Sequence, residues 1–150
     1  MRRGCQWALV MLLLGGCQGA SDVPSRTASG GAAPSSGTAA AVPVGHLQAV
    51  EARDFLATHP EALVLDVRDP DEWNDDLGHI DGARQIPLAA LPSRLDEVAA
   101  WRDRPVVVVC RVGARSQRAA ELLAEAGYRQ VMNLEGGMAA WRQSEAARAR

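Results

Sequence analysis

The feature that most constrains this fold is a run of four consecutive valines, Val106 to Val109, which follows Pro105 and ends at Cys110. β-Branched residues favour extended backbone, and an apolar run without polar alternation is typical of a strand that is buried on both faces. Such strands lie inside parallel sheets that are covered by helices on both sides. The sequence therefore predicts that this run is a central strand of an α/β domain.

Strand-like and helix-like segments alternate on either side of this run. Residues 116–126 carry apolar side chains on one face of a helix, whereas 62–66 is a continuous apolar run that ends on a carboxylate. Further strands are expected at 47–50, 83–86 and 130–134, and further helices or helical turns at 51–58, 70–73, 93–101 and 138–142. This alternation implies a central parallel five-stranded sheet flanked by helices on both faces, with right-handed crossovers. A ligand is expected beyond the carboxyl ends of the strands, where Cys110 lies.

The N-terminal segment has the pattern of an export signal. Residues 1–16 carry two arginines directly after Met1, contain the apolar run 7–14, and are followed by Cys17. As a helix the apolar run reaches about 12 Å, too short for a bilayer core of ~30 Å. Its Leu-Gly-Gly-Cys end resembles the lipobox of bacterial lipoproteins, in which the cysteine is lipidated; an ordinary signal peptide is the alternative. By the same resemblance, Gln18 favours the outer over the inner membrane.

The segment 17–45 is expected to be a lipidated cysteine followed by a flexible tether. Of the 28 residues from 18 to 45, 22 are Gly, Ala, Ser, Pro or Thr. Such a composition buries too little apolar surface to offset the entropy of ordering. We expect a folded domain over 46–143 and a C-terminal tail over 144–150. The protein would lie in the bacterial cell envelope, facing the periplasm, with membrane contact through the lipid anchor alone.

Charge and residue counts exclude several classes of function. The chain has 16 basic and 18 acidic residues and a formal net charge of −2, which argues against nucleic acid as the main partner. All the basic residues are arginine, so lysine Schiff-base chemistry is excluded. The three cysteines are too few and too scattered for a disulfide scaffold or a four-ligand zinc site, and the three histidines show no metal-ligand spacing. With the signal removed and Cys17 lipidated, Cys110 would be the single free thiol.

The loop after the valine run carries the candidate chemistry, with the residues Cys110, Arg111, Val112, Gly113, Ala114, Arg115 and Ser116. Gly113 supplies the conformational freedom for a sharp turn, and successive amide N–H groups beside a helix N-terminus can form a nest for an anion. Such a nest stabilises a thiolate, so we expect Cys110 to be a nucleophile. Arg111 and Arg115 can pair with an oxyanion. Ser116 is expected to cap the helix or to donate a hydrogen bond, because the sequence shows no Ser–His–Asp arrangement.

This loop resembles the active-site loop of rhodanese-type sulfurtransferases, which read Cys-x-x-Gly-x-Arg. Three more stretches resemble the same family: Leu65–Arg68 with Glu72-Trp73, Gly78–Ala83 with Ile86–Leu88, and Leu134–Met138 with Trp141. They follow one another in the order and spacing of a single rhodanese domain over about 46–143. One departure is the segment 74–77, which lengthens the spacing between Trp73 and His79. We expect it to alter a surface loop and to leave the sulfur site intact.

The resemblance implies a two-step sulfur transfer. Cys110 would attack the outer sulfur of a small anionic donor such as thiosulfate, and would then pass this sulfur from a persulfide to cyanide or to a thiol. In the cell the acceptor thiol would belong to a small molecule or a protein. The backbone amides of 111–116 would hold the persulfide, while Arg111 and Arg115 would bind or steer the donor. Exchange between sulfurs needs a thiolate and a good leaving group, with no cofactor or metal.

Two alternative functions stay open. Rhodanese-related phosphatases and arsenate reductases place five residues between the cysteine and the arginine, whereas four separate Cys110 from Arg115, which favours a sulfur atom over a tetrahedral oxyanion. A catalytically idle module that carries sulfur or binds a partner would have the same motif. Asp66 and Arg68 are expected to brace the strand ends near the loop. The acidic stretch 66–81 is expected to be a solvated face, with a docking surface as the alternative.

Overall fold

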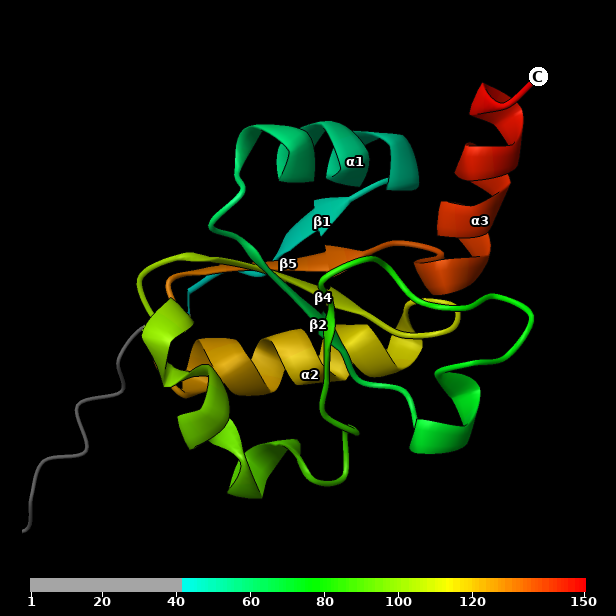
Figure 1. The fold of residues 1–150 in the computed structure, drawn as a ribbon. Coiled ribbons are helices and arrows are strands. Elements are labelled where there is room, and N and C mark those ends of the chain that lie inside the picture. The colour runs from blue at the N-terminus through cyan, green and yellow to red at the C-terminus, as the bar shows by residue number, and fades with distance from the viewer. Residues whose placement is uncertain (1–41) are drawn as a thin grey trace, which may run out of the picture. The chain divides into compact units, whose positions relative to one another are not determined.

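The computed structural model describes residues 42–150 (Figure 1). The predicted signal 1–16, the lipidated Cys17 and the tether up to residue 41 lie outside the described residues. Five strands form one parallel sheet in the order β1-β5-β4-β2-β3. In chain order they are β1 (Gly45–Leu47), β2 (Leu63–Asp66), β3 (Arg84–Gln85), β4 (Pro105–Val109) and β5 (Gln130–Leu134). The predicted five-stranded parallel sheet is confirmed, and the valine run is its middle strand.

Helices cover both faces of the sheet, as predicted (Figure 1). Helices α1 (Ala49–Thr58) and α3 (Gly137–Arg148) lie over one face. Helix α2 (Ala114–Glu125) lies over the other face, together with the 3₁₀ segments η2 (Leu91–Ser93) and η3 (Leu95–Trp101). A further 3₁₀ turn, η1 (Pro70–Glu72), follows β2. No helix within 42–150 is long and apolar enough to cross a membrane.

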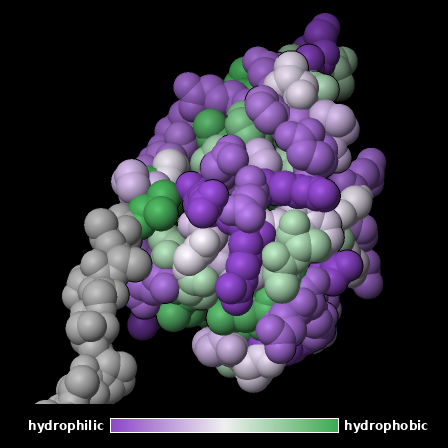
Figure 2. All heavy atoms as spheres, turned by 90° about the vertical axis from the view of Figure 1, so that its left-hand side faces the viewer, coloured by the Kyte–Doolittle hydropathy of each residue, from purple (hydrophilic) through white to green (hydrophobic). Residues whose placement is uncertain are grey.

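The valines of β4 join the two halves of the core. Val106 and Val108 pack in the cluster that contains Leu123 of α2, while Val107 and Val109 pack in the cluster that contains Met138 of α3. All four valines are fully buried. The absence of polar alternation in the run therefore reflects a strand with apolar contacts on both faces, which anchors the residue that follows it. Hydrophilic side chains cover most of the end of the domain that Figure 2 shows, and apolar ones appear there in scattered areas.

Three elements differ from the sequence predictions. The first strand ends at Leu47 because α1 already begins at Ala49, where the N–H of Gln48 donates to the carboxylate of Glu51. The segment predicted as a helix at 93–101 is a 3₁₀ segment from Leu95 onward. Its side chains at 95, 98 and 101 contact the core, and a three-residue repeat places them on one stripe of a 3₁₀ helix.

Helix α3 is longer than the predicted 138–142 and includes residues 144–148, which were expected to form a tail. Contacts with α1 support this extension. The guanidinium of Arg53 donates to the Ser144 hydroxyl at 2.9 Å and pairs with Glu145 at 3.1 Å. It also stacks on the ring of Trp141 at 3.9 Å. These partners lie about ninety positions from Arg53, so the local sequence pattern does not reveal them.

Candidate active site

The loop between β4 and α2 lies at the carboxyl edge of the sheet, on the right-hand side of Figure 1. Cys110 follows the last residue of β4, and α2 begins four residues later at Ala114. Gly113 closes the turn with a φ of 104°, which L-side chains rarely adopt. A Cβ atom at Gly113 would also lie 3.3 Å from the backbone nitrogen of Gly136. Glycine therefore serves both the turn and the close approach of the neighbouring loop.

The sulfur of Cys110 lies inside this turn, and the residue is 1% exposed. The N–H of Gly113 donates to Sγ at 3.1 Å, and the hydroxyl of Ser116 lies 3.3 Å from Sγ. Burial by itself raises the pKa of Cys110, because it penalises the thiolate. The hydrogen bonds from the Ser116 hydroxyl and from the amides of Ser116, Gly113 and Val112 outweigh burial. The pKa of Cys110 is therefore lower than that of an ordinary cysteine.

Ser116 has the second of its two predicted roles. Gly113 occupies the N-cap position of α2, and Ser116 lies in the first turn of that helix. Its hydroxyl oxygen is 3.0 Å from the carbonyl oxygen of Gly113 as well as 3.3 Å from Sγ. A hydroxyl has one proton and can donate to one of these acceptors at a time. A thiolate at Cys110 is the charged acceptor of the two, so ionisation favours the bond to sulfur.

The start of α3 donates two backbone hydrogen bonds to the loop 110–116. The N–H of Met138 donates to the carbonyl of Cys110 at 2.8 Å, and the N–H of Ala139 donates to that of Arg111 at 3.1 Å. Gly137 has a φ of 55°, and a Cβ atom there would clash with the carbonyl oxygen of Cys110. The sequence marked this segment as a family motif without a role at the site. The two consecutive glycines at the start of this helix, Gly136 and Gly137, were the feature of the sequence that could have indicated a close backbone contact.

Asp66 and Arg68 form a buried ion pair at the end of β2. The Arg68 guanidinium donates to the Asp66 carboxylate at 2.7 and 2.9 Å. It also donates to the carbonyl of Glu72 at 2.9 Å and to that of Gly78 at 2.7 Å. Arg68 thereby ties the segment after β2 to the sheet edge. This is the bracing position that the sequence predicted, and neither side chain contacts Cys110 in these hydrogen bonds.

Arg115 of the loop 110–116 is paired with acids of the segment after β2. Its guanidinium donates to both carboxylate oxygens of Glu72, at 2.6 and 2.7 Å, and lies 3.2 Å from Asp69. The hydrogen bond from Arg115 is the main cause that lowers the pKa of Glu72 from 4.5 to about 2. The same pairing raises the pKa of Arg115.

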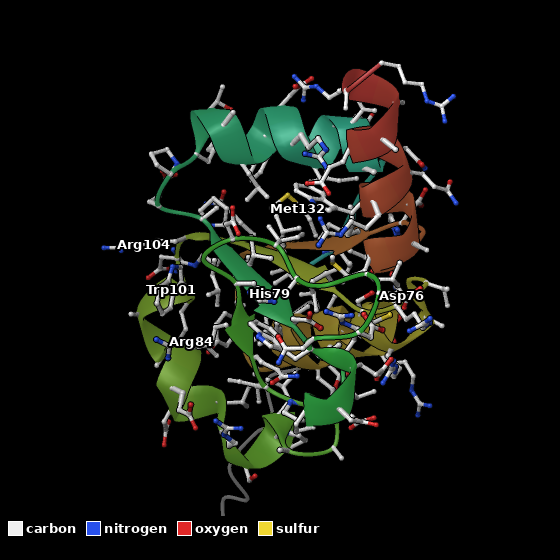
Figure 3. All side chains as sticks on the ribbon, turned by 45° about the vertical axis from the view of Figure 1, so that its right-hand side comes forward. Asp76, His79, Arg84, Trp101, Arg104 and Met132 are labelled. Carbon is white, nitrogen blue, oxygen red and sulfur yellow. The ribbon has the colours of Figure 1, made fainter. Side chains whose placement is uncertain are left out.

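Arg111 is paired as well, with residues of the lengthened segment 74–77. Its guanidinium lies 2.5 Å from the carboxylate of Asp75 and 3.7 Å from that of Asp76. Figure 3 shows Asp76 on the same side as the loop after β4. The segment 74–77 therefore does more than alter a surface loop, because it pairs with Arg111, while the donors to Sγ of Cys110 are in place. The prediction of a solvated face for the acids between 66 and 81 holds only in part, because some of them pair with the arginines of the loop. The pairs join residues 35 to 46 positions apart, so local patterns did not show them.

A groove of about 570 Å³ opens beside Arg115. Apolar side chains of the segment after β3 and of α2 line part of it, and the full lining is Val67, Asp69, Leu88, Ala89, Pro92, Arg115, Arg118, Glu121, Leu122 and Glu125. This volume is in the range of small-molecule sites. Within residues 42–150 no group of His, Cys, Asp and Glu side chains is arranged to hold a metal ion.

Comparison with known protein families matches residues 48–144 to the Rhodanese-like domain. The chain belongs to the rhodanese family. Among its relatives, Thiosulfate sulfurtransferase GlpE of Shewanella oneidensis is 41% identical over 83 residues, which are 55% of this chain and 78% of the relative. The Rhodanese-like domain of the Alr3790 protein from Anabaena sp. superposes with a TM-score of 0.60 at 30% identity, over 68% of this chain and 76% of that one.

Some relatives are much longer than this rhodanese. The Probable adenylyltransferase/sulfurtransferase MoeZ of Mycobacterium tuberculosis is 38% identical over 91 residues, which are 61% of this chain and 23% of the relative. The chain thus spans about a quarter of that relative's length. The family that matches residues 48–144 of this chain is the one that the sequence predicted.

Proposed function

We propose that the protein is a sulfurtransferase that carries sulfur as a persulfide on Cys110. The observation that carries this proposal is the position of Sγ, which receives hydrogen bonds from Gly113 and Ser116 at the N-terminus of α2. These donors stabilise a negative sulfur, as a thiolate before transfer and as a persulfide after it. The name of the Shewanella relative, a thiosulfate sulfurtransferase, supports the same reaction class.

In the first step, the Cys110 thiolate attacks the outer sulfur of thiosulfate. The sulfur–sulfur bond of the donor breaks, sulfite leaves with the electron pair, and Cys110 becomes a persulfide. In the second step, an acceptor thiolate attacks the outer sulfur, and the Cys110 thiolate is released. Each step exchanges one sulfur–sulfur bond for another, so no external oxidant is consumed.

Mass spectrometry of the full chain after thiosulfate treatment tests the persulfide directly. We expect the wild type to gain one sulfur atom on the peptide that contains Cys110, and to release thiocyanate when cyanide is added. Cys110→Ser is the matched control, because it replaces sulfur by oxygen without opening a cavity, and it should do neither. Wild-type protein that gains no sulfur, or gains it on another peptide, would contradict the proposal.

A catalytically idle module that carries sulfur or binds a partner is the second candidate function. It is favoured by the burial of Cys110 and by the ion pairs that occupy both arginines of the loop. Such a module would accept one sulfur and hold it. Repeated turnover of thiosulfate and cyanide at a constant rate, dependent on Cys110, distinguishes an enzyme from this module.

We also propose that the protein is tethered to a membrane by a lipid on Cys17 and faces the periplasm. The support is the sequence pattern of a short apolar run that ends in Leu-Gly-Gly-Cys, followed by the Gly-, Ala-, Ser- and Pro-rich segment. Expression in a bacterium with radiolabelled fatty acid tests it. The wild type should incorporate label and partition into detergent, whereas Cys17→Ser should not. An unlabelled wild-type chain would contradict the tether.

A further inference from the structure

The residues 74–78, called the acidic strap below, are flanked in the sequence by Trp73 and His79, whose rings stack on each other. The centroids of the two rings are 4.2 Å apart and the rings are nearly parallel; His79, labelled in Figure 3, is the residue directly after the strap. Inside the strap, the N–H of Leu77 donates to the side-chain carboxylate of Asp75 at 2.9 Å. The strap is therefore held at both ends, and the carboxylate of Asp75 is fixed within it.

Asp75 bridges two arginines. One carboxylate oxygen lies 3.5 Å from the buried guanidinium of Arg68, and the other accepts a hydrogen bond from Arg111 at 2.5 Å. Asp66 fixes the guanidinium of Arg68 by a hydrogen bond. Arg68 in turn holds the carboxylate of Asp75 in the position from which it contacts Arg111. The side chain of Asp75 is 18% exposed and that of Arg111 is 45% exposed, so solvent screens this pair in part. Arg111 is thus neutralised at the place where it would meet an anionic donor.

The rim of the site carries an excess of negative charge. The two guanidinium groups of the loop face four carboxylates, from Asp69, Glu72, Asp75 and Asp76, which leaves a formal charge of −2. A doubly charged donor such as thiosulfate is repelled by such a rim. Around the same loop, Val112 is 64% exposed, and the neighbouring groove has a partly apolar lining. An organic donor of low charge finds apolar contacts there.

We propose that Asp75 determines donor specificity: by holding Arg111, it directs the site toward organic persulfides, R–S–SH, and away from thiosulfate. This inference rests on the proposed sulfurtransferase function. The Cys110 thiolate attacks the outer sulfur of R–S–SH, the S–S bond of the donor breaks, and R–S⁻ leaves with the electron pair. The sulfur of Cys110 then carries the transferred SH group as a persulfide, Cys–S–SH, so atoms and charge balance.

The test compares the rate at which Cys110 is loaded with sulfur by two donors, thiosulfate and cysteine hydropersulfide. Loading is followed in single turnover by quenching and mass spectrometry. Asp75→Asn keeps the oxygen that accepts from Leu77 and removes the charge. We expect it to raise the loading rate with thiosulfate by about fivefold, and that with the less charged hydropersulfide by about twofold or less.

Two variants show whether Asp75 acts through Arg111. Asp71→Asn removes an exposed carboxylate of η1 that pairs with neither arginine of the loop, and it should leave the ratio of the two rates unchanged. In an Arg111→Ala background, Asp75→Asn should have a smaller effect on that ratio, because only its contribution to the negative charge around the loop is left, as a double-mutant cycle requires of coupled residues. A ratio that shifts equally in this background would overturn the assignment.

A measurement on the wild type keeps the proposal testable if the variant does not fold. Added salt screens repulsion, so loading by thiosulfate should become faster as ionic strength rises. A rate that falls with salt would mean an attractive, cationic site and would refute the inference. Equal changes with both donors in Asp75→Asn would show a structural role alone. Loading by neither donor would overturn the proposed function itself, whereas loading by both with an unaltered ratio overturns this inference only.

Discussion

Removal of the Ser116 hydroxyl should weaken the stabilisation of the Cys110 thiolate. In the structure this hydroxyl is 3.3 Å from Sγ, and both residues are buried. A hydrogen bond to a charged group contributes about 1.5–3 kcal/mol, and the lower end applies here because the hydroxyl also faces the carbonyl of Gly113. The ratio of thiolate to thiol at a given pH should therefore fall by about tenfold in Ser116→Ala.

The assay is the rate of alkylation of Cys110 by iodoacetamide as a function of pH, with the modified peptide identified by mass. The sign follows from the hydrogen bond: its loss raises the pKa of Cys110, so the rate profile of Ser116→Ala shifts to higher pH. Ser93→Ala is the matched control, because its hydroxyl donates to the carbonyl of Ala90, away from the site. A folded Ser116→Ala protein with the wild-type profile would refute the role of this hydroxyl.

Three further changes test the surroundings of the loop. Gly137→Ala should lower the free energy of unfolding by more than Gly82→Ala in urea denaturation: both glycines have positive φ, which costs alanine about 1–2 kcal/mol, but only Gly137 faces a clash. Equal losses would argue against tight packing of α3 on the loop. Asp66→Ala should cost about 3 kcal/mol in the same assay, since it removes the close partner of a buried guanidinium and leaves Arg68 only the 3.5 Å contact with Asp75 and its two carbonyl acceptors; a loss under about 1 kcal/mol, typical of a surface pair, would contradict this. Glu72 has a folded pKa of about 2 against an ordinary 4.5, so its contribution to stability is complete above pH 4.5 and is lost as pH falls to about 2. Glu72→Gln should be less stable than wild type at neutral pH and equal to it near pH 2, and a difference independent of pH would exclude this ion pair.

The central strand and the catalytic loop could be predicted because their signals are local. Four consecutive valines give a strand no polar face, so the sequence predicted a strand that is buried on both faces. The position of Cys110 followed from the rule that parallel strands present their carboxyl ends to the ligand. Gly113 was marked by its place between a strand and a helix, and it has the positive φ that the turn requires.

The electrostatic surroundings of the loop could not be predicted, because they depend on pairs far apart in the chain. Arg111 and Arg115 were expected to be available to an anionic donor, but the segment after β2 folds back and places Asp75 and Glu72 against them. This fold-back depends on Arg68, whose buried guanidinium binds two carbonyl groups of that segment. The sequence shows that these acids are present. It does not show that hydrogen bonds from the buried Arg68 place their segment against the loop.

The most direct test of the account is a titration of the Cys110 thiolate by its ultraviolet absorbance. The full-length protein is compared with Cys110→Ser, so that the difference isolates this sulfur from the other two cysteines of the chain. We predict a single transition centred below the pKa of an ordinary cysteine, because the amides of the loop and the Ser116 hydroxyl favour the charged form. A sulfur that stays protonated until strongly alkaline pH would contradict the account.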